Sequence, residues 1–257
     1  MNHYNAVGFD ASDREAFRGT VSSLAVLGER EDGSLGSRLL WTDPSGAAIA
    51  VFVRDMSIVC AKPTFAGGSR LVVRPMGAMA DPDGCAFCAI NKVDVFDGDE
   101  MAYPLAIELD DIHLGPLPVG DDLVPIAVTA FAETITVWSD IDAYNESKAS
   151  EEHPLAPRSL IPSGMFGPDG GDRPLRAEAI ITGVVIDAER RTNRQSVRPF
   201  DWCRVETYAA TIDLVSEARD EEFAPGQVVQ GTFWLVGRRL DTPVTTHRRR
   251  FLRPRQP

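Results

Sequence analysis

The chain has 257 residues, a net charge of −12 and an ordinary globular composition, with 44% hydrophobic and 25% charged residues. This composition excludes disordered and collagen-like chains, and no stretch approaches the roughly 18 uninterrupted apolar residues of a membrane span. Since the first residues lack a basic segment followed by an apolar one, and only four cysteines occur, we expect a cytoplasmic protein with free thiols and no membrane partner. Residues 1–152 hold 25 acidic and 10 basic side chains, so this part carries −15 and the rest +3.

The first predicted element is a helix that begins near Ser12. Ser12 and Glu15 have the spacing of a capping box, and apolar residues from Phe17 to Ala25 recur on one face at helical period.

From residue 37 onward, short runs of β-branched and aromatic residues predict strands. These runs span residues 37–43, 47–53, 57–60, 69–75, 85–96, 102–110 and 125–138. Asp43-Pro44-Ser45-Gly46 has turn chemistry, so residues 37–53 should form a hairpin. A short helix over 139–149 is favoured by Asp140 and Asp142 in its first turn. We expect residues 1–150 to form an acidic, β-rich domain with an N-terminal helix and an antiparallel sheet.

Residues 151–175 contain five prolines and four glycines, which predicts an irregular connector. Its apolar residues, among them Leu160 and Ile161, would need burial, so we expect it to dock on a domain surface. Three β segments follow at 177–189, 200–217 and 228–240, and the middle one is long enough to bend or to form two strands. Residues 176–257 should therefore form a small OB-like β-barrel with a basic tail. The predicted fold class is mainly β.

The C-terminal part carries four short patterns, Thr182-Gly183-Val184-Val185, residues 188–193, residues 200–207 and Pro225 to Leu235. With these patterns, residues 160–240 resemble a family of uncharacterised bacterial proteins with the pattern TGVV, AExRxN, FxWxxVxT and PGxVVxGxFWL. The family has no assigned activity, so the resemblance implies no function. Members often carry Thr-Gly in the first hairpin, where this chain has Ser196-Val197.

Cys85 and Cys88 have the spacing of a metal or redox pair. On a strand that starts at Cys85, alternation sends the two sulfur atoms to opposite faces, where they cannot share a metal. Cys60 and Cys203 are isolated and supply no second ligand pair, so we interpret the cysteines as small buried apolar side chains.

Acidic residues suggest one chemical site. Carboxylates that could bind a divalent cation or act as acid and base cluster at Asp94, Asp97, Asp99 and Glu100. The other interpretation is a pair of solvated strand ends.

Catalytic motifs are otherwise missing from the sequence. It has no G-x-S-x-G elbow, no H-E-x-x-H pair and no Walker lysine. The glycines near 164–171 cannot form a phosphate loop, because Pro168 and Pro174 prevent the helix that such a loop requires. We expect no cofactor.

Basic residues end the chain and suggest a nucleic-acid site. The candidate residues are Arg238, Arg239, Arg248, Arg249 and Arg250, with Trp234 as a stacking face. The alternative is a tail docked on the acidic domain.

Taken together, these patterns favour a non-enzymatic binding or scaffold protein that acts through protein contacts, including self-association through strand edges. Two alternatives stay open: single-stranded nucleic-acid binding by the barrel and its arginine tail, and a divalent-metal-dependent enzyme that uses the acidic cluster.

Overall fold

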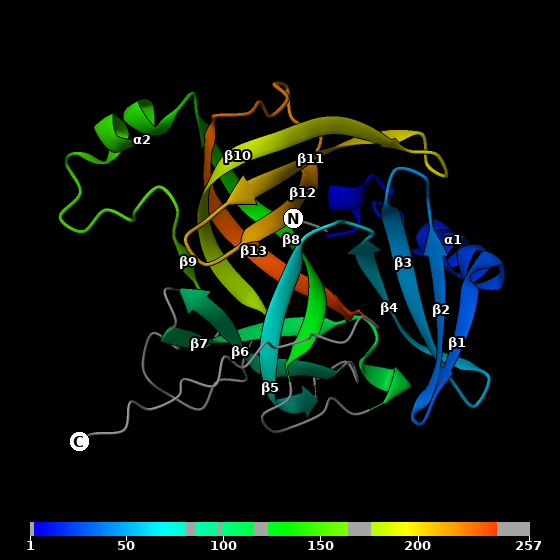
Figure 1. The fold of residues 1–257 in the computed structure, drawn as a ribbon. Helices are drawn as coiled ribbons and strands as arrows, with labels where there is room; N and C mark the ends of the chain where they lie inside the picture. Colours follow the sequence, from blue (N-terminus) through cyan, green and yellow to red (C-terminus); the bar gives the residue numbers. More distant parts are fainter. Residues whose placement is uncertain (1–2, 81–85, 97–98, 116–122, 164–175, 241–257) are drawn as a thin grey trace, which may run out of the picture.

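In the computed structural model, the described residues are 3–80, 86–96, 99–115, 123–163 and 176–240, and the side chains of 76–103 and 113 lie outside the description. The helices are η1 (Asn5–Val7), α1 (Arg14–Leu27), η2 (Ile112–Leu114) and α2 (Ile141–Lys148). The first strands are β1 (Glu29–Gly33), β2 (Gly36–Thr42), β3 (Ala47–Arg54), β4 (Ser57–Phe65), β5 (Arg70–Ala80), β6 (Ala86–Phe96) and β7 (Asp99–Leu109). The others are β8 (Val124–Trp138), β9 (Leu160–Ile161), β10 (Glu178–Asn193), β11 (Arg198–Glu206), β12 (Thr211–Glu217) and β13 (Val228–Arg239). The predicted mainly β class is confirmed (Figure 1).

Helix α1 forms where the period of apolar residues predicts it, but its cap differs from the prediction. Asp13 is the N-cap residue, and its Oδ1 accepts hydrogen bonds from the backbone N–H groups of Glu15 and Ala16. Ser12 instead donates its hydroxyl to Asp10. A carboxylate adds favourable charge at the positive end of the helix, which a serine hydroxyl does not.

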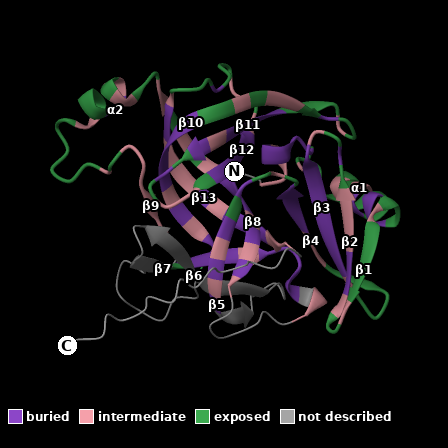
Figure 2. Ribbon diagram, viewed as in Figure 1, coloured by how far each residue is buried: buried purple, intermediate pink, exposed green. Residues whose placement is uncertain are grey.

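Strands β1 to β4 form an antiparallel sheet in chain order. The predicted hairpin is confirmed as β2 and β3, with Ser37 opposite Val53. Asp43 shapes its turn by accepting a hydrogen bond from the Ser45 N–H, and Gly46 takes a left-handed conformation with φ of 92°. Figure 2 shows that β3 is buried along most of its length, as expected for a strand paired on both sides and covered by a helix.

Strands β5 to β13 form one larger, mixed sheet. Strand β8 pairs with β13 antiparallel and with β12 parallel, while β13 pairs with β10, β10 with β11, and β11 with β12. These pairings form a cycle of five strands. Strands β5, β6 and β7 link β8 to β13 a second time, through pairings of β5 with β8 and of β7 with β13.

The expected OB-like barrel over residues 176–257 is not found as a separate unit. Strand β8, from before the connector, lies between β12 and β13 in the cycle, so one sheet spans both sides of residues 151–175. The alternation in 125–138 predicts a strand, but it cannot identify the partner strands, because pairing is decided by tertiary packing. The middle segment does form two strands, β11 and β12.

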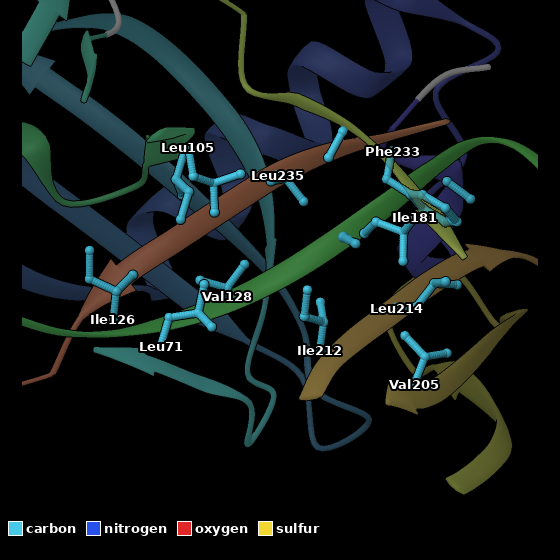
Figure 3. Close-up of a cluster of buried hydrophobic side chains, with 14 of the residues drawn as sticks. Leu71, Leu105, Ile126, Val128, Ile181, Val205, Ile212, Leu214, Phe233 and Leu235 are labelled. Atoms are coloured by element: carbon cyan, nitrogen blue, oxygen red, sulfur yellow. The ribbon is translucent and has the colours of Figure 1, made fainter. Parts of the chain in front are cut away.

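One large apolar cluster packs within this larger sheet (Figure 3). Side chains from before the connector, such as Leu71, Leu105 and Ile126, join the same cluster as Ile181 and Leu214 from after it. The hydrophobic effect therefore stabilises both parts of the chain together.

The connector contacts the larger sheet within its described part, residues 151–163. Leu160 and Ile161 form β9, which pairs with β10, and the Arg158 side chain contacts Glu206 at 2.9 Å. Helix α2 forms within the range predicted for it, capped by Asp140, which accepts a hydrogen bond from the Ala143 N–H.

A buried ion pair joins the two sheets. The Arg38 guanidinium on β2 donates to the Asp110 carboxylate at 2.6 Å, and the Thr64 hydroxyl on β4 donates to the same carboxylate at 2.9 Å. Asp110 is fully buried, and burial raises its pKa to about 6 although the Arg38 charge opposes this shift. Removing one partner of such a pair leaves a buried charge uncompensated, which is strongly destabilising.

None of the helices among the described residues has the length and apolar character needed to cross a membrane.

Candidate functional site

A groove of about 820 Å³ lies between α1 and the edge strand β4. Its apolar described lining comes from Tyr4, Ala11, Phe17, Val21, Ile58, Cys60 and Ala61. Its polar lining on α1 comes from Arg14, Arg18 and Ser22. A concave, mostly apolar surface with a few convergent polar groups is the usual form of a binding site.

The sequence of α1 explains why one wall of the groove is cationic. Val21, Leu24 and Ala25 are buried, and α1 contacts β2 and β3. Arg14 and Arg18 are one helical turn apart, so they lie on the same face of the helix, beside the buried stripe. Both are exposed. The described part of the chain provides no ion-pair partner for either guanidinium.

The floor of the groove is the face of β4 that α1 leaves open. Ile58 pairs with Val53 and Ala61 with Val51, so these β4 residues lie on the same face as the β3 residues that pack in the core beneath α1. Ile58 remains 49% exposed. Among the described residues, an apolar part of this face is thus exposed at Ile58.

The outer edge of β4 is protected against pairing with another strand. The Tyr4 hydroxyl donates to the Ala61 carbonyl at 2.6 Å, which occupies an acceptor of the edge. Pro63 has no N–H group to offer, and a bulge at Val59 interrupts the register with β3. Burial raises the pKa of Tyr4 to about 12, with the Glu108 charge adding to the shift, so its hydroxyl keeps its proton. These devices are those with which proteins prevent edge-to-edge association.

Exposed apolar side chains continue from the groove along the β3–β4 hairpin. Met56 is 95% exposed and Val59 is 40% exposed. Asp55 and Met56 form the turn with φ values of 49° and 63°. A large apolar side chain at the tip of a hairpin contributes nothing to the core, and such exposure is typical of interaction surfaces.

A second, polar pocket of about 470 Å³ lies at the β10–β11 hairpin. Arg190, Arg191 and Arg194 line it. Two of the three are engaged: Arg190 contacts Asp201 at 2.7 Å and Arg191 contacts Glu189 at 2.8 Å. The positive charge of the pocket is therefore largely compensated.

The acidic residues predicted to hold a metal lie at one hairpin, formed by β6 and β7. Glu100 pairs with Val95 and Asp99 with Phe96, and Asp94 directly precedes Val95 and pairs with Met101. The side chains of Asp94, Asp99 and Glu100, and all of Asp97, lie outside the description, so the metal site stays a prediction. Among the described residues, no three histidine, cysteine or acidic side chains gather as metal ligands would.

The cysteines divide into two kinds. Cys203 is a buried free thiol, and burial raises its pKa well above the usual value, which makes it unreactive. Cys60 is disulfide-bonded, so the expectation that the thiols are free is wrong for this residue. Cys85 and the side chain of Cys88 lie outside the described residues, and the backbone of Cys88 is within β6.

Two residues of the predicted nucleic-acid site make internal contacts. Arg239 donates to Asp111 at 3.0 Å. Trp234 stacks on His3 with ring centroids 4.4 Å apart and donates its indole N–H to Glu108 at 2.8 Å. Arg238 precedes Arg239 at the end of β13. Arg248, Arg249 and Arg250 fall outside the described residues, so nucleic-acid binding stays a prediction.

Comparisons with protein-family models, with curated proteins and with solved structures found no match for this chain. The resemblance suggested by the C-terminal patterns therefore stays a prediction.

Sequence reasoning missed the groove, because its two walls are 40 residues apart in the chain and meet only through tertiary packing. One signal was available. Arg14 and Arg18 have i,i+4 spacing on a predicted helix, which places two like charges one turn apart, and Glu15, three residues before Arg18, can pair with only one of them.

Proposed function

We propose that this chain is a non-enzymatic protein-binding protein, and that the groove between α1 and β4 is its binding site. The observation that carries the proposal is the open apolar floor at Ile58 and Ala61, bounded by the unpartnered Arg14 and Arg18. A groove whose floor is apolar and whose rim is charged matches the anatomy of protein interfaces.

A binding role suits the groove better than catalysis. The described residues of its lining include no carboxylate and no histidine, so none of them can act as a general base of that kind. The Ser22 hydroxyl donates to the Arg18 carbonyl at 3.0 Å and is not activated as a nucleophile. The arginines supply charge and hydrogen bonds only.

A macromolecular ligand suits the groove better than a small molecule. The apolar surface continues beyond the groove to Met56 and Val59, which a small ligand held between α1 and β4 would leave exposed. Covering these side chains as well requires a segment that extends past the end of the groove. A protein segment has this length.

Photocrosslinking tests the proposal. Benzoylphenylalanine placed at Ser22 should give covalent adducts with a protein from an extract of the native cells, because Ser22 lines the groove. Ser147 on α2 is the matched control, since it is also an exposed helix serine that donates to a backbone carbonyl. Adducts at Ser22 should disappear when Ile58 is replaced by Glu. Equal adducts from both positions, or none, would refute the proposal.

The second candidate function is single-stranded nucleic-acid binding, supported by the five-strand cycle. We propose that the pocket lined by Arg190, Arg191 and Arg194, at the β10–β11 hairpin of this cycle, contacts the phosphate backbone of the nucleic acid. Fluorescence anisotropy with labelled oligo-dT tests this: binding should weaken with salt and with Arg194→Glu. Binding unaffected by either would exclude this site.

A further inference from the structure

On the basis of the proposed function, we infer the chemistry of the partner: the groove binds an amphipathic helix that carries acidic residues one turn apart beside its apolar stripe. Three features of the groove lead to this inference, namely the protected edge of β4, the spacing of the arginines and the form of the floor.

The protected edge of β4 argues against an added strand. A bound strand gains its affinity from backbone hydrogen bonds along the edge. Here Tyr4 already donates to Ala61, and Pro63 lacks a donor, so the ladder is interrupted at alternate residues. A helix satisfies its own backbone groups and needs only a side-chain surface. The groove is therefore suited to a helix and not to an extended peptide.

The spacing of the arginines specifies where the partner's charge should lie. Arg14 and Arg18 are separated by one helical turn, which places their Cβ atoms roughly 6 Å apart. Two carboxylates at i and i+4 of a partner helix have the same separation, so each can meet one guanidinium. The opposite preference would be expected from the bulk charge, because residues 1–152 carry −15 and attract cations. A measured preference for an acidic partner would therefore come from Arg14 and Arg18 and not from the net charge of residues 1–152.

The floor provides the apolar contact that such a helix needs. Phe17 on α1 faces the groove together with Ile58 and Ala61 on β4, and the exposed Met56 lies two residues before Ile58 at the tip of the β3–β4 hairpin. Methionine adapts its shape to different partners. A leucine stripe at i, i+3, i+4 and i+7 matches an apolar groove of this kind.

Two designed peptides test the inference. Each is a fluorescein-labelled 21-residue helix with the same leucine stripe, and its flanking positions are Glu in one peptide and Lys in the other. Anisotropy titrations at low salt should give about tenfold tighter binding of the Glu peptide, which corresponds to about 1.4 kcal/mol shared between two exposed ion pairs. In the double variant Arg14→Glu/Arg18→Glu the preference should reverse, and in Arg14→Gln/Arg18→Gln it should disappear. The control is Arg194→Glu, which replaces an exposed arginine on the β10–β11 hairpin and should leave the preference for the Glu peptide unchanged.

Specific outcomes would overturn the inference. A Lys peptide that binds as tightly as the Glu peptide would show that the arginines do not select the partner. A Glu peptide with a central proline that binds equally well would show that the ligand need not be helical. If neither peptide binds while the Ser22 crosslink forms, the groove is a protein-binding site with a partner of other chemistry. If Ser22 forms no crosslink, the proposed function itself fails.

Discussion

Replacement of Val197 by glycine should stabilise the protein, because Val197 is held in an unfavourable backbone conformation. Its φ is 58°, in the left-handed region, where a β-branched residue is rarely found. The position is fixed by the hairpin: the Val197 N–H donates to the Asn193 carbonyl at 2.8 Å. The side chain is 78% exposed, so little burial is lost when it is removed.

The magnitude follows from two opposing effects. The left-handed conformation costs an L-residue roughly 1–2 kcal/mol, which glycine does not incur. Glycine also increases the conformational entropy of the unfolded chain, which costs roughly 0.5–1 kcal/mol. The net gain in unfolding free energy should be about 0.5–1 kcal/mol, or an increase in Tm of roughly 2 °C for a chain of this size.

Urea and thermal unfolding measure this effect, with Val197→Ala as the matched control. Alanine removes nearly the same exposed side chain but keeps the Cβ that disfavours the left-handed region, so its stability should differ from the natural chain by less than about 0.5 kcal/mol. If the glycine variant is no more stable than the alanine variant, the backbone strain at Val197 is not real.

Two further predictions concern stability. Because burial raises the pKa of Asp110 to about 6 from an unfolded value of 3.8, the native state holds this proton more tightly, and the unfolding free energy should fall as pH rises from about 4 to 6. Urea unfolding at each pH gives the unfolding free energies of the natural chain and of Asp110→Asn. Between pH 4 and 6, the natural chain should lose roughly 3 kcal/mol of unfolding free energy relative to the variant. A pH-independent difference would show that Asp110 titrates normally. Gly19→Ala in α1 should raise the unfolding free energy by about 0.5–1 kcal/mol, because a Cβ at this position meets no atom within 4 Å. Gly231→Ala should lower the unfolding free energy by several kcal/mol, because its Cβ would lie 2.0 Å from the Thr134 carbonyl oxygen. Urea unfolding that ranks these two variants in the reverse order would contradict the local geometry.

The individual strands could be predicted from the sequence because local alternation determines them. Strand β8 occupies the alternating run at 125–138, and Asp43 to Gly46 turn the chain as their chemistry indicates. Strand β1 was not predicted: its sequence, Glu-Arg-Glu-Asp-Gly, is charged and exposed. Such a strand forms through pairing with β2, and its charges suit a sheet edge.

The arrangement of the strands and the groove could not be predicted. The parallel pairing of β12 with β8 joins residues more than 80 positions apart, and no periodicity encodes it. The buried Arg38–Asp110 pair likewise joins two segments that look like solvated surface in the sequence. The groove depends on α1 lying over β2 and β3 and leaving β4 uncovered, which only the packed structure reveals.

Backbone amide shifts of the ¹⁵N-labelled protein, titrated with the Leu/Glu peptide, give the most direct test that α1 and β4 form a binding site. We predict shift changes concentrated at residues 11–22 and 57–61, which contain the groove lining apart from Tyr4. Changes confined to the β10–β11 hairpin, or shifts that do not move at saturating peptide, would contradict the account.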